Sequence, residues 1–128
     1  MRLLLDTHVA LWAITADRRL TRPARARLTA DDAEVFVSAA SLWEIGIKHA
    51  LGRGDMPVDA ELAAEEFRRA GFRPLAITWT HMGRAAALPP LHRDPFDRLL
   101  VAQALAEPLV LMTHDARVAA YDAGILEV

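Results

Sequence analysis

The stretch that decides the fold lies at the start of the chain and reads Arg2-Leu3-Leu4-Leu5-Asp6-Thr7-His8. A run of three leucines is too short for a helix, and the aspartate that follows it is a favoured helix N-cap. The stretch therefore predicts a buried strand over 2–5 that passes directly into a helix over 7–15. The same pattern returns later, where Leu109-Val110-Leu111-Met112 precedes Thr113-His114-Asp115.

Strands and helices are expected to alternate between and beyond these two stretches. The strands are continuous apolar runs, which is typical of a parallel sheet covered by helices on both faces. We therefore predict an α/β fold, namely an α/β/α sandwich with a central, mainly parallel sheet. Further strands are expected over 34–37, within 71–77 and over 125–128, and further helices over 22–28, 38–51, 59–69, 80–88, 96–106 and 115–121.

Length and composition fit a single globular domain over residues 1–128. Of the 128 residues, 53% are hydrophobic and 25% are charged, so a chain of this size should bury roughly two thirds of its unfolded surface. The sequence has no cysteine, which excludes thiol catalysis, iron–sulfur clusters and cysteine-bound zinc. No apolar run approaches the ~20 residues of a membrane helix. We expect no membrane association and a cytoplasmic location.

Four acidic residues are expected near the ends of the strands. Asp6, Asp97 and Asp115 fall at or near the first turn of a helix, and Glu44 lies about two turns into another. Each of the aspartates has an alternative interpretation as a plain helix cap, which stabilises a helix by about 0.5–2 kcal/mol. For Glu44 the alternative is a capping box with Ser41, if the helix begins late. The four are nevertheless expected to converge, because strand C-termini and the following helix N-termini share one edge of a parallel sheet. Carboxylates gathered in this way predict a site for a hard divalent cation such as Mg²⁺ or Mn²⁺.

A metal held by carboxylates can activate water and offset phosphate charge. Two relatives of this layout do not fit the sequence. Phosphotransfer enzymes with an aspartyl nucleophile generally require a second aspartate two positions after the first, where this chain has His8. Receiver domains want a lysine after the last core strand, whereas the only lysine, Lys48, lies in a predicted helix. A nuclease site made of carboxylates alone needs neither feature.

Four stretches, taken together, closely resemble PIN-domain proteins, and among these the VapC toxins of bacterial toxin–antitoxin systems. The motifs occur in the family order and at the family spacing, and they span essentially the whole chain. They are Leu3-Leu4-Leu5-Asp6-Thr7-His8, Val37-Ser38-Ala39-Ala40-Ser41-Leu42-Trp43-Glu44-Ile45, His92-Arg93-Asp94-Pro95-Phe96-Asp97-Arg98-Leu99-Leu100-Val101-Ala102-Gln103-Ala104 and Leu111-Met112-Thr113-His114-Asp115.

The resemblance implies a PIN-like sandwich and a Mg²⁺- or Mn²⁺-dependent endoribonuclease toxin. It also implies a homodimer that a cognate antitoxin neutralises by filling the active-site groove. By motif, Asp6 and Asp97 resemble the principal metal ligands, Glu44 the second acid and Asp115 the fourth. The hydroxyls of Thr7 and Thr113, two residues that begin helices, are candidates for orienting these ligands.

Basic residues are the candidates for binding an RNA substrate, although the net charge of −2 predicts no broad cationic face. One of two arginine clusters is expected to bind phosphates, the alternative being a solvated helix surface. Arg98, beside Asp97, is a further candidate contact. The clusters are Arg18, Arg19, Arg22, Arg25 and Arg27, and Arg68, Arg69 and Arg73.

The remaining candidates are interpreted as structural. Trp12, Trp43, Trp79 and Phe96 are expected in the core or a dimer interface rather than stacked on bases. The histidines lack the compact spacing of a metal site and are expected to be structural or on the surface. These are His8, His49, His81, His92 and His114.

Two other functions stay open. The chain could be a catalytically idle PIN-like module that binds RNA or a partner protein, although such a module has no reason to keep four mutually repelling acids. A nuclease that acts on DNA is the third interpretation, but a chain of this length leaves no residues for an extension that binds duplex DNA.

Overall fold

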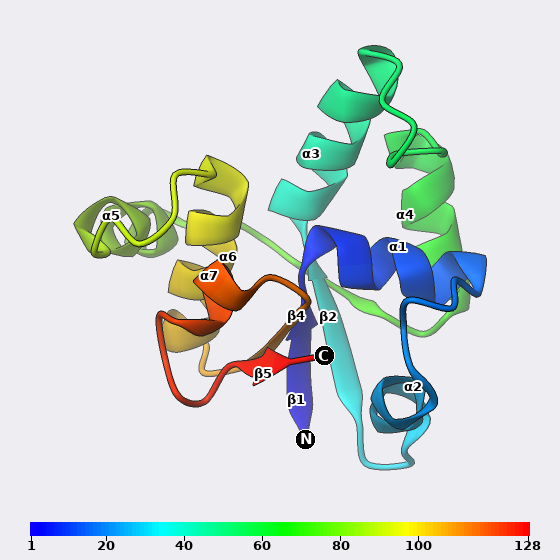
Figure 1. Ribbon diagram of the computed structural model, residues 1–128, viewed down its shortest axis with the longest axis horizontal. Coiled ribbons are helices and arrows are strands. Elements are labelled where there is room, and N and C mark those ends of the chain that lie inside the picture. Colours follow the sequence, from blue (N-terminus) through cyan, green and yellow to red (C-terminus); the bar gives the residue numbers. More distant parts are fainter.

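A five-stranded parallel sheet forms the middle of the molecule, between two groups of helices (Figure 1). The computed structural model describes all 128 residues. The strand order is β3-β2-β1-β4-β5, and every neighbouring pair is parallel. The predicted sandwich with a parallel sheet is therefore confirmed. The strands are β1 (Arg2–Leu5), β2 (Glu34–Ser38), β3 (Arg73–Leu75), β4 (Val110–Thr113) and β5 (Leu126–Glu127).

The helices divide between the two faces of the sheet. In Figure 1, α1 to α4 lie on one side and α5 to α7 on the other. All seven are preceded by a residue whose side-chain oxygen accepts a backbone N–H of the first turn, as an N-cap does. The helices are α1 (Thr7–Thr15), α2 (Arg22–Thr29), α3 (Ala39–Ala50), α4 (Ala60–Arg69), α5 (Trp79–Ala87), α6 (Pro95–Ala106) and α7 (Ala116–Ala119).

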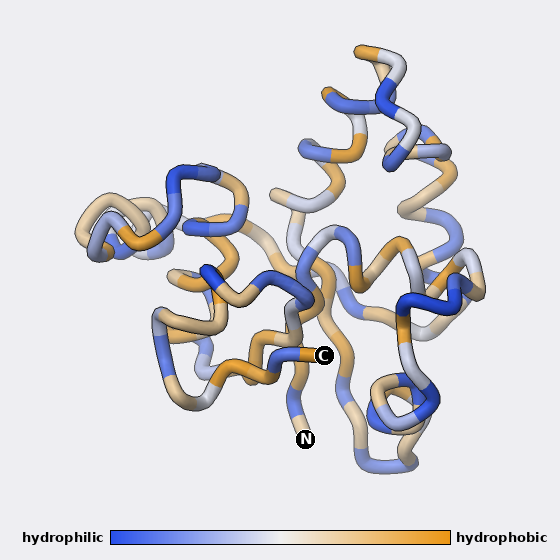
Figure 2. The backbone as a smooth tube through the Cα atoms, viewed as in Figure 1, coloured by the Kyte–Doolittle hydropathy of each residue, from blue (hydrophilic) through white to orange (hydrophobic).

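The leucines of β1 show why the central strand is apolar throughout. Successive side chains of a strand point to opposite faces, so Leu3 and Leu5 join the core beneath α1 to α4 while Leu4 joins the core beneath α6 and α7. All three are fully buried. Figure 2 shows the hydrophobic colouring concentrated on the strands at the centre of the molecule. The strand thus ties the two layers into one domain.

A buried polar chain fixes α3 and α5 against α6. Ser38, the N-cap of α3, donates its hydroxyl to Gln103 Oε1 at 2.5 Å, and Gln103 Nε2 lies 3.3 Å from Nδ1 of the buried His81. His81 Nε2 lies 2.5 Å from Glu107 Oε2. Each of these side chains has a partner, so the chain of contacts holds the helices without an unsatisfied buried group. The placement of α3 matters because it carries Glu44.

The differences from the predicted elements are small. The closing strand covers only Leu126–Glu127, and β3 is restricted to Arg73–Leu75. Because α3 begins at Ala39 with Ser38 as its cap, Ser41 and Glu44 do not form a capping box. None of the helices has the length and apolar character needed to cross a bilayer.

Candidate functional site

The predicted acidic residues line one cleft at the carboxyl ends of the strands. The cleft has a volume of about 480 Å³. Asp6 follows β1, Glu44 comes from α3, Asp97 from the first turn of α6, and Asp115 follows β4. The convergence expected from the topology is therefore present, and Asp94 adds a fifth carboxylate. The other lining residues are His8, Trp12, Lys48, His92, His114, Ala116 and Arg117.

Asp6 combines the capping role with a place in the cleft. Its Oδ1 accepts the backbone N–H of Val9 at 2.8 Å, as an N-cap does. Its Oδ2 accepts the hydroxyl of Thr113 at 2.5 Å. Burial raises the pKa of Asp6 even though these hydrogen bonds act to lower it. Asp6 therefore caps α1 through Oδ1, as the alternative interpretation predicts, and it also lines the cleft.

Glu44 is held from two sides in a buried position. Thr7 donates its hydroxyl to Glu44 Oε1 at 2.6 Å and lies 3.0 Å from the hydroxyl of Ser41. The ammonium of Lys48, one turn further along α3, pairs with Glu44 Oε2. The expectation that Thr7 and Thr113 orient acidic side chains agrees with these contacts. Glu44 therefore presents a fixed carboxylate whose charge is balanced by a cation from its own helix.

Asp97 has no such cation. Its Oδ2 forms a hydrogen bond of 2.8 Å with Nε2 of His92. Burial, followed by the charges of Asp94, Asp6 and Glu44, raises the pKa of Asp97 to about 6, although His92 acts in the opposite direction. Asp97 is therefore a carboxylate of the cleft that pairs with no lysine or arginine.

Asp115 resembles Glu44 rather than Asp97. Burial acts to raise its pKa, but hydrogen bonds from the side chain and backbone of Arg117, with the positive charge of Arg117, hold the pKa below its ordinary value. Its Oδ2 also lies 3.3 Å from Nε2 of His92. The four predicted acids thus fall into two groups. Glu44 and Asp115 each pair with a lysine or arginine, whereas Asp6 and Asp97 have no lysine or arginine partner.

His92 is the site residue that sequence reasoning missed. Its Nε2 and one carboxylate oxygen each of Asp97 and Asp115 lie within 4.8 Å of one another, which is close enough to hold a metal ion. The backbone N–H of Asp94 points to His92 Nδ1 at 3.4 Å. His92 lies in a loop, so no helix or strand periodicity indicates where its side chain lies. The only signal in the sequence is its position five residues before Asp97 and two before the Asp94 cap.

The donor set fits a hard divalent cation. Carboxylate oxygens are the ligands of Mg²⁺ and Mn²⁺, and an imidazole nitrogen among them suits Mn²⁺ as well. Asp6 is not part of the tight group of three donors, although its charge is among those that raise the pKa of Asp97. Asp97 and Asp115, with the imidazole nitrogen of His92, are therefore the donors close enough to share an ion, and Asp6 lines the same cleft.

The arginines behave differently from the expectation. Arg98 does not face the cleft, because its guanidinium donates to the backbone carbonyls of Ala85, Leu88 and Pro89 and to the Tyr121 hydroxyl. Because these donors are used within the fold, the structure gives no support to the predicted contact of Arg98 with RNA.

The predicted arginine clusters are also partly engaged in holding the fold together. Arg25 donates to the carbonyls of Trp12, Ala13 and Asp17. Arg19 pairs with Asp17 and lies over the Trp12 ring at 5.0 Å. In the second cluster, Arg69 and Arg73 pair with neighbouring glutamates.

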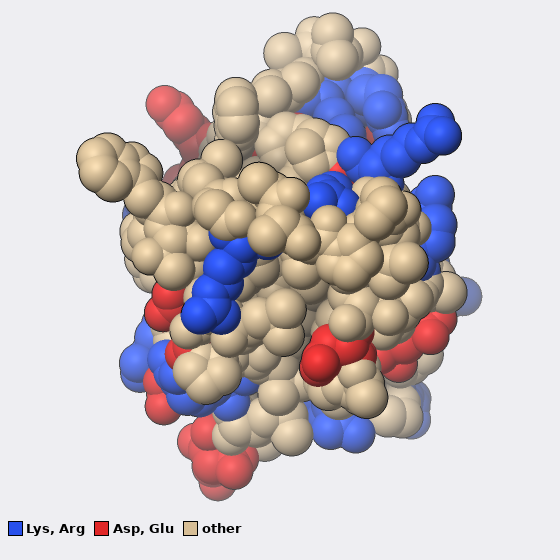
Figure 3. Space-filling view, turned by 90° about the vertical axis from the view of Figure 1, so that its left-hand side faces the viewer, with Lys and Arg blue, Asp and Glu red and all other residues tan.

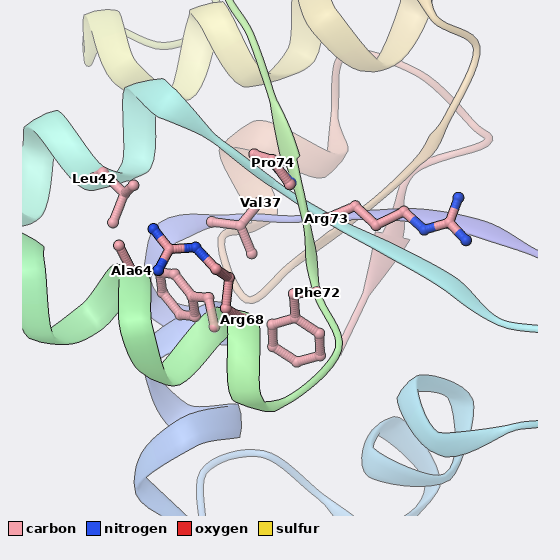
Figure 4. Close-up of a pocket in the computed structure, with 8 residues that line it drawn as sticks. Val37, Leu42, Ala64, Arg68, Phe72, Arg73 and Pro74 are labelled. Atoms are coloured by element: carbon pink, nitrogen blue, oxygen red, sulfur yellow. The ribbon is translucent and has the colours of Figure 1, made fainter.

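A second cavity, of about 120 Å³, lies between α3, α4 and β3. In Figure 4 its lining includes Val37, Leu42, Ala64, Phe72 and Pro74, with the Arg68 guanidinium close to Leu42 and Ala64. No carboxylate or histidine lines it. The cavity therefore lacks the carboxylate and imidazole donors that line the acidic cleft.

Comparison with known proteins gives a family and a fold. No curated protein matches the sequence. Among solved structures, similar chains occur in VapBC2 of Rickettsia felis bound to a promoter DNA fragment (16% identity, TM-score 0.67, 100% of this chain and 98% of that one) and in a toxin–antitoxin complex from Klebsiella pneumoniae (18%, 0.65, 98% and 99%). VapBC-1 of nontypeable Haemophilus influenzae is similar as well (15%, 0.64, 100% and 97%). At these identities the likeness establishes the fold. The PIN domain family matches residues 3–124, nearly the whole chain, and it is to this family that the protein belongs.

Proposed function

We propose that this chain is a metal-dependent endoribonuclease and the toxin of a toxin–antitoxin pair. The observation that carries the proposal is the cleft in which Asp6, Glu44, Asp97 and Asp115 meet. Buried carboxylates that repel one another destabilise a fold, so their gathering favours a site that binds a cation. The similar chains from toxin–antitoxin complexes support the same assignment.

In this proposal, Asp6 and Asp97 are the principal ligands of Mg²⁺ or Mn²⁺, and Asp115 and Glu44 complete the acidic set. A divalent cation bound there supplies positive charge for a phosphodiester and promotes attack by water. The chain's own side chains fix the carboxylates. Thr113 orients Asp6, Thr7 orients Glu44, and His92 holds Asp97. Such outer hydrogen bonds set the direction of the ligand oxygens before any ion arrives.

The proposed partners are an antitoxin and a second copy of the chain. α3 exposes a stripe at Trp43, Ile47 and Leu51, and α5 exposes Trp79 and Met82, with Trp79 95% exposed. In Figure 3, uncharged surface covers much of the face turned to the viewer, with a few Lys or Arg side chains across it. Exposed aromatic and apolar patches of this kind mark interaction surfaces. We assign this face to the homodimer, and the acidic cleft to inhibition by the antitoxin.

Cleavage of RNA by the antitoxin-free protein tests the enzymatic function. Total cellular RNA and structured tRNAs would be incubated with the wild type or the Asp97→Ala variant in Mg²⁺, Mn²⁺ or EDTA. Cutting at discrete sites by the wild type alone, and only with metal, is the expected result. If a folded wild type cuts nothing while it and the variant bind RNA or a partner equally well, the chain is a catalytically idle binding module instead.

A further inference from the structure

The acidic cleft presents an electrostatic problem to the RNA substrate proposed above. Five carboxylates line the cleft, and their negative charges repel a phosphate group that enters it. Only two permanently charged cations line the same cleft, Lys48 and Arg117. These two residues are therefore the lining cations that could attract a phosphate inside the cleft.

Lys48 has the geometry of a fixed cation. It lies one helical turn after Glu44 on α3, and its side chain is only 17% exposed. Its ammonium is paired with Glu44 Oε2, whose other oxygen is held by Thr7. A lysine restrained in this way loses little side-chain freedom when a ligand binds, unlike a lysine on the open surface.

The ammonium also has donors to spare. A lysine ammonium carries three N–H groups, and its hydrogen bond to Glu44 Oε2 uses one of them. Two donors remain at the wall of the cleft. Arg117 differs in its exposure rather than in its donors. Its two hydrogen bonds with Asp115 leave three of its five N–H groups free, but its side chain is 68% exposed and less restrained than that of Lys48.

We propose that Lys48 is the phosphate-binding residue of the cleft. Its ammonium stays paired with Glu44 and donates a second hydrogen bond to a non-bridging oxygen of an RNA phosphate. The inference rests on the proposed function, since it requires RNA as the substrate. The competing explanation is that Lys48 only balances the charge of Glu44, and the two explanations differ in what they predict for the salt dependence of RNA binding.

Anisotropy of a fluorescein-labelled single-stranded RNA, measured in EDTA over a range of salt concentrations, provides the test. Each phosphate contact contributes about 0.7 to the slope of log affinity against log salt for a single strand. The Lys48→Met variant should bind about tenfold more weakly at low salt and lose about 0.7 of the slope. The Lys48→Arg variant should keep the slope. The control is Arg2→Met, which removes a cation at the start of β1, the end of the strand away from the cleft, where its guanidinium donates to the carbonyl of Glu107.

A second pair of variants covers the case in which Lys48→Met leaves Glu44 unpaired and unfolds the protein. Glu44→Gln removes the charge that Lys48 balances, and the double variant Glu44→Gln/Lys48→Met then removes the lysine. The proposal expects the slope to fall by about 0.7 between these two variants. An equal slope would mean that Lys48 only balances Glu44, and would overturn the inference.

The outcomes separate this inference from the proposed function. Metal-dependent RNA cleavage by the wild type, together with an unchanged slope in the lysine variants, overturns the role of Lys48 alone. A wild type that cleaves RNA but shows no metal-independent, salt-dependent binding overturns it as well. A wild type that neither binds nor cuts RNA overturns both proposals.

Discussion

Replacing Asp97 by asparagine should stabilise the metal-free protein at neutral pH. The side chain is 19% exposed, and burial with the charges of Asp94, Asp6 and Glu44 raises its pKa from 3.8 to about 6. Each pH unit corresponds to about 1.4 kcal/mol. Ionising Asp97 therefore costs about 3 kcal/mol more in the folded protein than in the unfolded chain. Asparagine avoids this cost and keeps an oxygen that can accept the hydrogen bond from His92.

The sign of the pH dependence follows from the raised pKa. Between the unfolded value of 3.8 and the folded value of about 6, the native state binds more protons than the unfolded state. The free energy of unfolding of the wild type therefore falls as the pH rises through this range, and then levels off. The advantage of Asp97→Asn should be about 3 kcal/mol at pH 8 and about half of that at pH 5.

Urea unfolding in EDTA between pH 5 and pH 8 measures this difference. Asp31→Asn, at an exposed aspartate without a hydrogen-bond partner, controls for the loss of one negative charge. Asp115→Asn should have the opposite effect, because Arg117 holds the pKa of Asp115 low and its ionisation stabilises the fold. The reasoning is refuted if Asp97→Asn is no more stable than the wild type at pH 8, or if its advantage does not shrink towards pH 5.

Three further substitutions test other parts of the structure. Thr113→Val removes the hydroxyl that orients Asp6 and should weaken Mg²⁺ binding by about tenfold or more in calorimetry; unchanged affinity would contradict that role. Arg98→Met leaves several backbone carbonyls without a donor and should lower the free energy of unfolding by about 2–4 kcal/mol. The salt dependence of RNA binding should stay the same in this variant, and a smaller slope would restore Arg98 as an RNA contact. Trp79→Ser removes a 95% exposed side chain and should shift sedimentation towards the monomer without a change in circular dichroism, whereas an unaltered dimer would place the interface elsewhere.

The sequence predicts the fold well because local and global signals agree. Each main strand is an apolar run that ends at a residue able to cap a helix, so the boundary between strand and helix is marked by a change in chemistry. β1 shows the strongest case, since Leu3, Leu4 and Leu5 are all buried and serve both cores. The convergence of the four acids is predictable for a related reason, because a parallel sheet brings the ends of its strands to one edge.

Sequence reasoning cannot place residues whose role is set by a loop path. His92 lies in the segment between α5 and α6, and no periodicity fixes the direction of such a segment. The structure anchors this loop through Tyr121, whose hydroxyl accepts the backbone N–H of His92 and donates to the carbonyl of Pro89. Arg98 donates to the same carbonyl. Arg98, beside Asp97, thus uses its donors within the fold. His92, which the sequence analysis interprets as structural or on the surface, lies among the acids.

The position of Arg98 sharpens the argument for a cation site at Asp97. An arginine directly follows this aspartate in the sequence, and pairing the two would relieve the uncompensated charge that raises the pKa of Asp97. Instead the guanidinium binds backbone carbonyls on the far side of the loop, while Glu44 and Asp115 each keep a cation from their own helix. A fold selected for stability alone would not leave Asp97 without a lysine or arginine partner in this way. The uncompensated charge at Asp97, with Asp6 beside it in the cleft, is what a divalent ion would neutralise, and this supports Asp6 and Asp97 as the proposed ligands.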